Sequence, residues 1–129
     1  MPRFFNPDGV PGPFNTYSHG AVVEGPLRFL FGAGQVGVHP DGRIGAGIEE
    51  QARLVWQHIV TVLAGAEMGI ENIVQLNMLL VDRDDRGPAS EVRGEFLGDH
   101  RPASTLMVVS GLANPDWLIE IDFIAAKEM

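Results

Sequence analysis

The segment at residues 73–81 most constrains how this chain can fold. Its positions separate into two alternating sets, because successive side chains of a β-strand point to opposite faces. One set is wholly apolar and consists of Val74, Leu76, Met78 and Leu80. The other set is mixed and consists of Ile73, Gln75, Asn77, Leu79 and Val81. The segment predicts a strand with one face buried against helices and a second face that is too apolar to lie comfortably in water.

Residues 118–125 show the same two-sided pattern and predict another such strand. One face carries Ile119, Ile121 and Phe123, and the other carries Leu118, Glu120, Asp122 and Ile124. Residues 47–68, which precede both of these strands in the chain, predict a helix, because apolar residues recur there every three or four positions. These residues are Ile48, Ala52, Val55, Ile59, Val62, Leu63 and Ala66.

The remaining segments complete the order strand, strand, helix, strand, helix, strand, strand, which is typical of an α+β fold. Further strands are predicted at residues 17–24, 28–35 and 104–112. The turn chemistry of residues 24–27 predicts a hairpin between the first two of these strands. The chain is then one domain, residues 1–129, with a mixed sheet and two helices packed on one of its faces.

The second helix is shorter and is predicted to begin near Pro88, a residue that the first turn of a helix tolerates. Its expected inward-facing residues are Val92, Phe96 and Leu97. Residues 1–16 contain four prolines, which disfavour a helix, and are predicted to form an irregular arm.

Two helices can cover only one face of the predicted sheet, so the other face needs a second partner. A subunit interface would cover it and would make the protein an oligomer. The alternative is that the arm at residues 1–16 folds over this face. The pattern favours the oligomer and leaves the alternative open.

The net charge of −8 argues against nucleic acid and anionic membranes as partners, because both require a cationic face. Four arginines gather loosely along the second half of the chain, but acidic residues interleave them and indicate a solvated surface. They are Arg83, Arg86, Arg93 and Arg101.

Other site types find no support in the sequence. There are no cysteines, and the four histidines lack the spacing of metal ligands, so no metal site is expected. The chain contains no signal segment and no apolar run of transmembrane length, so a cytoplasmic location is expected.

Two residues could carry chemistry. Tyr17, the only tyrosine, is either a ring that contacts a ligand or an ordinary edge aromatic. Glu120 lies between Ile119 and Ile121, so its carboxylate is either partly buried and suited to proton transfer or exposed beside Asp122. The residues alone leave both pairs of alternatives open.

The order and spacing of several short stretches resemble the Rid family, also called YjgF or endoribonuclease L-PSP-like proteins. The resemblance runs from about Asn15 to Ala126, which is nearly the whole chain. The matching stretches are Tyr17–Gly20, Gly34–Gln35, Ile48–Arg53, Glu71–Val74, Glu95–Leu97, Pro102–Ala103 and Ile119–Asp122.

The resemblance implies a chorismate-mutase-like α+β fold, a homotrimer, and a small-molecule ligand bound in clefts between adjacent subunits. Well-known members hydrolyse enamines and imines such as 2-aminoacrylate and release ammonia and a 2-keto acid, without a cofactor. Some relatives are reported as ribonucleases, a reading that the acidic charge of this chain does not support. On the resemblance, Tyr17 would line the cleft and Glu120 would position water, so these are the expected catalytic residues.

The expected ligand-binding residues follow the family only in part. Gly34 and Gln35 match its glycine–glutamine pair, but Ala33 stands where deaminating members carry serine. Ser90 stands for a helix asparagine, and Leu106 for a cysteine or threonine.

The main departure is Ser104, which occupies the position of the arginine that holds the substrate carboxylate. Arg101, three residues earlier, could reach the cleft from the preceding loop. Ser104 and Thr105 could instead donate hydrogen bonds to a neutral ligand group.

These observations lead to one main hypothesis and two alternatives. The main hypothesis is a trimer that hydrolyses or tautomerises an enamine or imine and has weak or no activity on 2-aminoacrylate. The first alternative is a non-catalytic trimer that binds a ligand or another protein. The second is an accessory enzyme that acts on an imine unrelated to amino acids.

Overall fold

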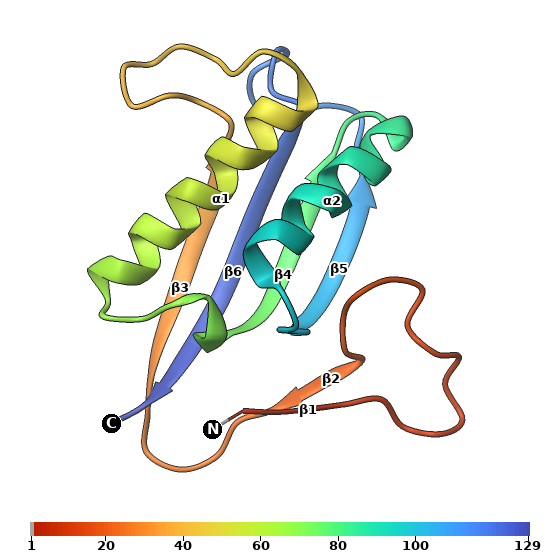
Figure 1. Ribbon diagram of the computed structural model, residues 1–129, viewed down its shortest axis with the longest axis vertical. Helices are drawn as coiled ribbons and strands as arrows, with labels where there is room; N and C mark the ends of the chain where they lie inside the picture. The colour runs from red at the N-terminus through yellow and green to blue at the C-terminus, as the bar shows by residue number, and fades with distance from the viewer. Residues whose placement is uncertain (1) are drawn as a thin grey trace.

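A four-stranded mixed sheet with two helices across one face forms the body of the molecule (Figure 1). The computed structural model describes residues 2–129. The strand order is β3-β6-β4-β5, in which β6 runs antiparallel to both of its neighbours and β5 runs parallel to β4. The bounds of these elements are Leu27–Val36 for β3, Gly47–Gly65 for α1, Ile73–Leu80 for β4, Arg86–Leu97 for α2, Ala103–Val108 for β5 and Ile119–Glu128 for β6. The predicted α+β class and the predicted helix layer are confirmed.

The core lies between the two helices and the wholly apolar faces of β4 and β6. Met78, Leu80, Ile119 and Ile121 have no exposed surface, as the alternation of these strands predicts. The helices contribute a further fully buried set that consists of Ala52, Val55, Trp56, Ile59, Leu63 and Ala89. The rings of Trp56 and Phe96 stack with centroids 5.9 Å apart, and so join α1 to α2 within the same layer.

Both helices differ slightly from their predicted bounds. The first ends at Gly65 rather than at residue 68, and the chain reverses at Glu67, which has a positive φ of 59°. Met68 still reaches the core, and its N–H bonds the carbonyl of Leu63 at 2.9 Å. The second helix begins at Arg86 and so places Pro88 in its first turn, as predicted.

The amino-terminal prediction was wrong in two respects. The arm contains a strand, β1 (Arg3–Phe5), and the strand predicted at residues 17–24 shrinks to β2 (Gly20–Val22). These two strands pair with each other in a separate sheet, so residues 24–27 connect two sheets instead of closing a hairpin. A side chain at position 20 would collide with the ring of Phe5, so glycine permits this pairing.

The strand predicted at residues 104–112 is also shorter, since β5 ends at Val108. It is not the neighbour of the last strand, because β4 lies between β5 and β6. The connection from β5 to β6 through Asn114 therefore passes β4 instead of joining adjacent strands.

The sheet face opposite the helices, called the open face below, remains uncovered in a single chain. Figure 1 shows the two-stranded amino-terminal sheet beside the β5 edge and not behind the main sheet. On the open face Phe31 is 73% exposed, Phe29 is 50% exposed and Met107 is 46% exposed. The arm therefore does not cover this face, and a subunit interface is left as its expected partner.

Candidate functional site

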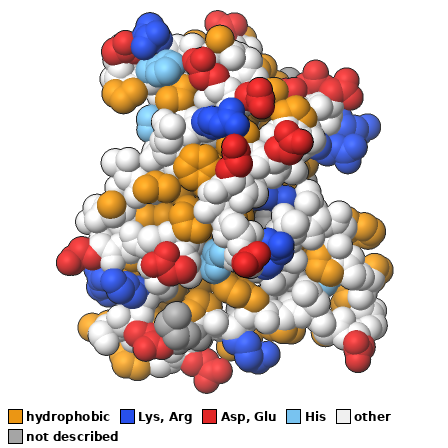
Figure 2. Space-filling view, in the orientation of Figure 1, with side chains coloured by type: hydrophobic (Ala, Val, Ile, Leu, Met, Phe, Trp, Pro, Cys, Tyr) orange, Lys and Arg blue, Asp and Glu red, His pale blue; other side chains and the backbone are white. Residues whose placement is uncertain are grey.

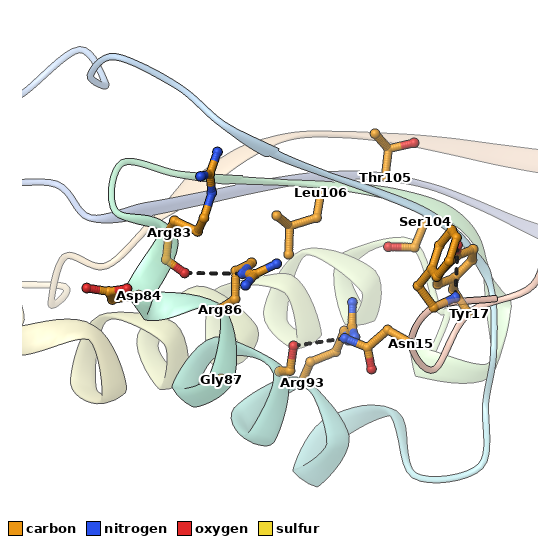
Figure 3. Close-up of a pocket in the computed structure, with 12 residues that line it drawn as sticks. Asn15, Tyr17, Arg83, Asp84, Arg86, Gly87, Arg93, Ser104, Thr105 and Leu106 are labelled. Carbon is orange, nitrogen blue, oxygen red and sulfur yellow. Dashed lines mark hydrogen bonds between the residues drawn. The ribbon is translucent and has the colours of Figure 1, made fainter.

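A cleft of about 840 Å³ opens at the edge of the sheet, between α2 and β5 (Figure 3). That volume lies in the range of small-molecule sites in proteins. Four parts of the chain line the cleft: residues 14–17, the turn η2 (Arg83–Asp85) that leads into α2, α2 itself, and β5. The lining residues are Phe14, Asn15, Tyr17, Arg83, Asp84, Arg86, Gly87, Ser90, Arg93, Ser104, Thr105 and Leu106.

Hydrogen bonds from the arm hold Tyr17 at this cleft. The side-chain amide of Asn15 donates to Ser90 Oγ on α2 at 3.1 Å. On the other side of Tyr17, the hydroxyl of Ser18 donates to the carbonyl of Arg101 at 2.6 Å. The phenol oxygen of Tyr17 accepts a bond from the N–H of Phe14 at 3.3 Å, which leaves its own proton free to be donated to a ligand.

Ser104 and Leu106 belong to the helix side of β5. Their register partners on β4 are Leu76 and Met78, which are buried beneath the helices. The hydroxyl oxygen of Ser104 is buried and has no hydrogen-bond partner among residues 2–129. The predicted cleft residues Tyr17, Ser90, Ser104, Thr105 and Leu106 therefore do come together.

Arg93 also lines this cleft, although the sequence analysis assigned it to a solvated surface; that interpretation was wrong. Only 2% of Arg93 is exposed. Its Nη2 donates to Thr16 Oγ1 at 3.3 Å, and its Nε has no partner in the described part of the chain. Burial lowers the pKa of Arg93, and the nearby positive charge of Arg101 lowers it further. A signal was present, because Arg93 lies on the same helical stripe as Ala89, Val92 and Phe96.

Arg101 does not line the cleft. Its Nη1 donates to the carbonyl of Gly98 at 2.8 Å, which turns the side chain back over the end of α2. Arg83 and Arg86, by contrast, are exposed residues at the rim of the cleft. The lining of the cleft thus contains three arginines, Arg83, Arg86 and Arg93, and one acidic residue, Asp84, although the net charge of the chain is −8.

The excess of arginines is a local feature of the cleft. In Figure 2, acidic and basic side chains are interspersed over the visible face, without a large area of one sign. Such a concentration of one charge in a hollow raises the local concentration of ligands of opposite charge.

Glu120 lies apart from this cleft, on the open face of β6. Its register partners are Leu79 on β4 and Val36 on β3. Its half-buried carboxylate lies over Gly34, where an added Cβ would collide with it. The β3–β6 register shifts between Gly32 and Gln35, and the side-chain amide of Gln35 donates to the carbonyl of Ala33 at 3.1 Å.

The predicted site residues therefore form two groups in one chain. The cleft group lies at the β5 edge. The Glu120 group consists of Glu120 on β6 and of Ala33, Gly34 and Gln35 on the neighbouring strand β3. Glu120 lies on the open face over Gly34, whereas Gln35 pairs with the buried Ile121 and belongs to the helix side of β3. Strand β4 separates β6 from β5, so Glu120 does not reach the cleft of its own chain. The shared cleft of Glu120 and Tyr17 remains a prediction that requires a second chain.

Residues 2–129 contain neither a cluster of metal-ligating side chains nor a membrane-spanning helix. No group of three or more histidine, aspartate or glutamate side chains has an arrangement that could hold a metal ion. No helix in that range is long and apolar enough to cross a membrane.

Comparisons with known proteins agree with this architecture. A family model described as Endoribonuclease L-PSP matches residues 9–127. A RutC family protein of Pyrococcus horikoshii is 36% identical over 123 residues, which cover 94% of each chain. TdcF of Escherichia coli, named as a candidate reactive intermediate deaminase, is 25% identical over 131 residues that cover 98% of each chain.

Solved structures give the same result. A protein of the Rid family from Yersinia pestis has a TM-score of 0.82 at 25% identity, with 96% of this chain and 97% of that chain covered. The crystal structure of Escherichia coli TdcF with bound serine has a TM-score of 0.72 at 26% identity, with 98% and 99% covered. The chain therefore belongs to the Rid family, the family of the Endoribonuclease L-PSP model.

Proposed function

We propose that this protein hydrolyses or tautomerises a small enamine or imine in clefts that form between the subunits of a homotrimer. The observation that carries the proposal is the separation of the two groups of site residues within one chain. A neighbouring copy that placed its Glu120 group beside the cleft group would complete a site. Its relatives support the chemistry, since TdcF is named as a candidate deaminase and has been crystallised with serine, a small amino acid.

The open face supports the trimer. The rings of Phe29 and Phe31 stack there with centroids 6.3 Å apart while both remain exposed. Exposed aromatic and methionine side chains on one face are typical of interfaces. Because Glu120 lies on the same face, an interface that buries these rings would also place Glu120 between the subunits.

Imine hydrolysis asks little of such a site, because the imine carbon is already electrophilic. Glu120 would orient a water molecule and accept its proton as the water oxygen bonds to that carbon. Tyr17 would hydrogen-bond the ligand through its free phenol proton. The electron pair of the carbon–nitrogen double bond moves to nitrogen, which takes the proton from Glu120 to give a carbinolamine. On collapse the hydroxyl proton of the carbinolamine passes to nitrogen, the carbon–nitrogen bond breaks, and ammonia and a carbonyl compound are released. No step requires a cofactor.

Activity on 2-aminoacrylate itself is expected to be weak or absent. The position of the family's carboxylate-binding arginine holds Ser104, whose hydroxyl offers no charge. A charge-assisted bidentate contact is about twice as strong as a neutral hydrogen bond. Without it on β5, the carboxylate of this short substrate would not be held at the family's position, and its imine carbon would be misplaced for attack by water.

A non-catalytic trimer that binds a ligand is the second candidate. The replacements at Ser90, Ser104 and Leu106 favour it, because each changes the chemistry of the cleft wall. The retained Glu120, held over Gly34, favours catalysis.

The test is a coupled assay that generates imines in situ from several amino acids and follows the carbonyl product. The wild-type protein should accelerate hydrolysis of at least one imine, and Glu120→Gln should reduce kcat by about 10²-fold or more while the protein stays folded. Conversion of 2-aminoacrylate should be slower than that of the best substrate. Acceleration that Glu120→Gln leaves unchanged would contradict the assigned role, and ligand binding without any acceleration would favour the second candidate.

A further inference from the structure

We propose that Arg93 on α2, together with Ser104 on β5, binds the anionic group of the ligand, a carboxylate or a similar oxoanion. The inference rests on the proposed function in one respect only, namely that the cleft is a ligand site. It assigns the site a ligand class and an anchoring residue that lies on a different element from the position of the family's arginine.

The electrostatics of Arg93 provide the first argument. A guanidinium stays protonated in proteins, so a buried arginine carries a positive charge that has lost its water. Such charges are normally paired, because an isolated buried charge is strongly unfavourable. Arg93 forms no ion pair with any carboxylate of residues 2–129, and the charge that acts on it is that of another arginine, Arg101. A bound anion would supply the missing countercharge.

The unused hydrogen-bond donors provide the second argument. Arg93 Nε and Ser104 Oγ are both buried and both lack a partner in the described chain. Both residues line the same cleft, one from the helix and one from the strand. Buried polar groups without partners are rare in folded proteins, so two of them in the lining of one cleft require a bound molecule or ion as their partner. An oxoanion accepts hydrogen bonds in several directions and can satisfy both groups at once.

The rim of the cleft fits an anionic ligand as well. Arg86 lies about two helical turns before Arg93. Its Nε donates to the carbonyl of Arg83 at 3.3 Å, which fixes it beside the opening. Figure 3 shows Arg86 and Arg93 along the α2 side of the space and Ser104 and Leu106 along the β5 side. The outer arginines would attract the ligand, and Arg93 would hold its charged end. The apolar side chain of Leu106 would contact the rest of the ligand.

Isothermal titration calorimetry with pyruvate and its neutral amide, pyruvamide, tests this assignment without turnover. The two probes have the same shape and differ in charge. The wild-type protein should bind pyruvate about tenfold or more tightly than pyruvamide, as expected for a charge-assisted contact. In Arg93→Gln this preference should disappear, because only the affinity for pyruvate falls.

Two further arginine variants separate the assignment from general charge effects. Arg53→Gln removes an equal charge from α1, at a surface ion pair with Glu95, and should leave the preference within about twofold of wild type. Arg101→Gln should behave like Arg53→Gln. If Arg93→Gln fails to fold, Ser104→Ala provides the test. This variant should weaken the binding of pyruvate by about threefold or more, and the affinity for pyruvamide should change by less than about threefold.

Equal affinity of the wild-type protein for the two probes would overturn the assignment. So would a preference that survives in Arg93→Gln, or one that is lost only in Arg101→Gln. If a carboxylate of a neighbouring subunit is paired with Arg93, the wild-type protein would bind the two probes equally. The Arg93→Gln variant would then also form a weaker trimer. Pyruvate binding that depends on Arg93, in a protein without imine hydrolysis, would contradict the proposed function and leave this inference standing.

Discussion

Arg93 is a charged residue whose buried position is unusual for its residue type. An arginine among acidic neighbours in the sequence is usually a solvated residue, and the helical stripe of Ala89, Val92 and Phe96 is the feature that places Arg93 inward. Neither composition nor spacing reports that its neighbours would lack a carboxylate. That information comes only from the packing of the arm and β5 around α2.

A buried and unpaired charge should cost stability in the ligand-free protein. We expect Arg93→Met, which keeps the length of the side chain and removes the charge, to raise the free energy of unfolding by about 1 kcal/mol in the absence of ligand. Denaturant unfolding at equal protein concentration would measure this change, with Arg53→Met as the control for a surface arginine. A loss of about 3 kcal/mol would show instead that Arg93 is paired in the native assembly.

At the scale of elements, the buried face of a strand could be predicted from the alternation of residues within that strand. The alternation in residues 73–81 and 118–125 correctly predicts the buried faces of β6 and of β4 from Leu76 to Leu80. It was wrong at Ile73, which lies in the core because the β4–β6 register shifts between Ile73 and Gln75. Strand neighbours could not be predicted, because the order β3-β6-β4-β5 depends on contacts between distant segments. The same reason explains the error in the arm, where β1 pairs with β2 through Phe5 and Gly20.

The register of β3 shifts between Gly32 and Gln35, and Gly34 within this segment leaves room for the carboxylate of Glu120. Gly34→Ala should push the Glu120 carboxylate aside, because the new methyl group would occupy its place. The flexible end of a glutamate can move, so the free energy of unfolding should fall by no more than about 1 kcal/mol. Imine turnover should nevertheless fall about tenfold or more, since a displaced base no longer orients water.

A matched control for this variant is Gly65→Ala at the end of α1, where the structure leaves open space and φ is not positive. It should leave turnover unchanged. Equal turnover of Gly34→Ala and wild type would mean that Glu120 does not act from its position over Gly34.

At the scale of the whole molecule, one chain holds the two groups of predicted site residues apart, because β4 lies between β5 and β6. The open face with Phe29, Phe31 and Met107 is apolar and exposed, and Glu120 lies on it. A closed trimer would bury that face three times and form three equivalent clefts. The family resemblance predicts the residues of both groups. Single-strand patterns could not predict the strand order β3-β6-β4-β5, which keeps the two groups apart within one chain.

The most direct test of a cleft shared between subunits is the mixing of two inactive variants. Tyr17→Ala damages the cleft group and Glu120→Gln damages the other group, so each homotrimer should be nearly inactive. Trimers co-assembled from equal amounts should recover about a quarter of wild-type turnover, because that fraction of the clefts combines an intact half from each chain. Light scattering should give about three times the chain mass of 14.0 kDa for every sample. Mixed trimers no more active than the two parent variants would contradict the account, as would a monomer at all concentrations.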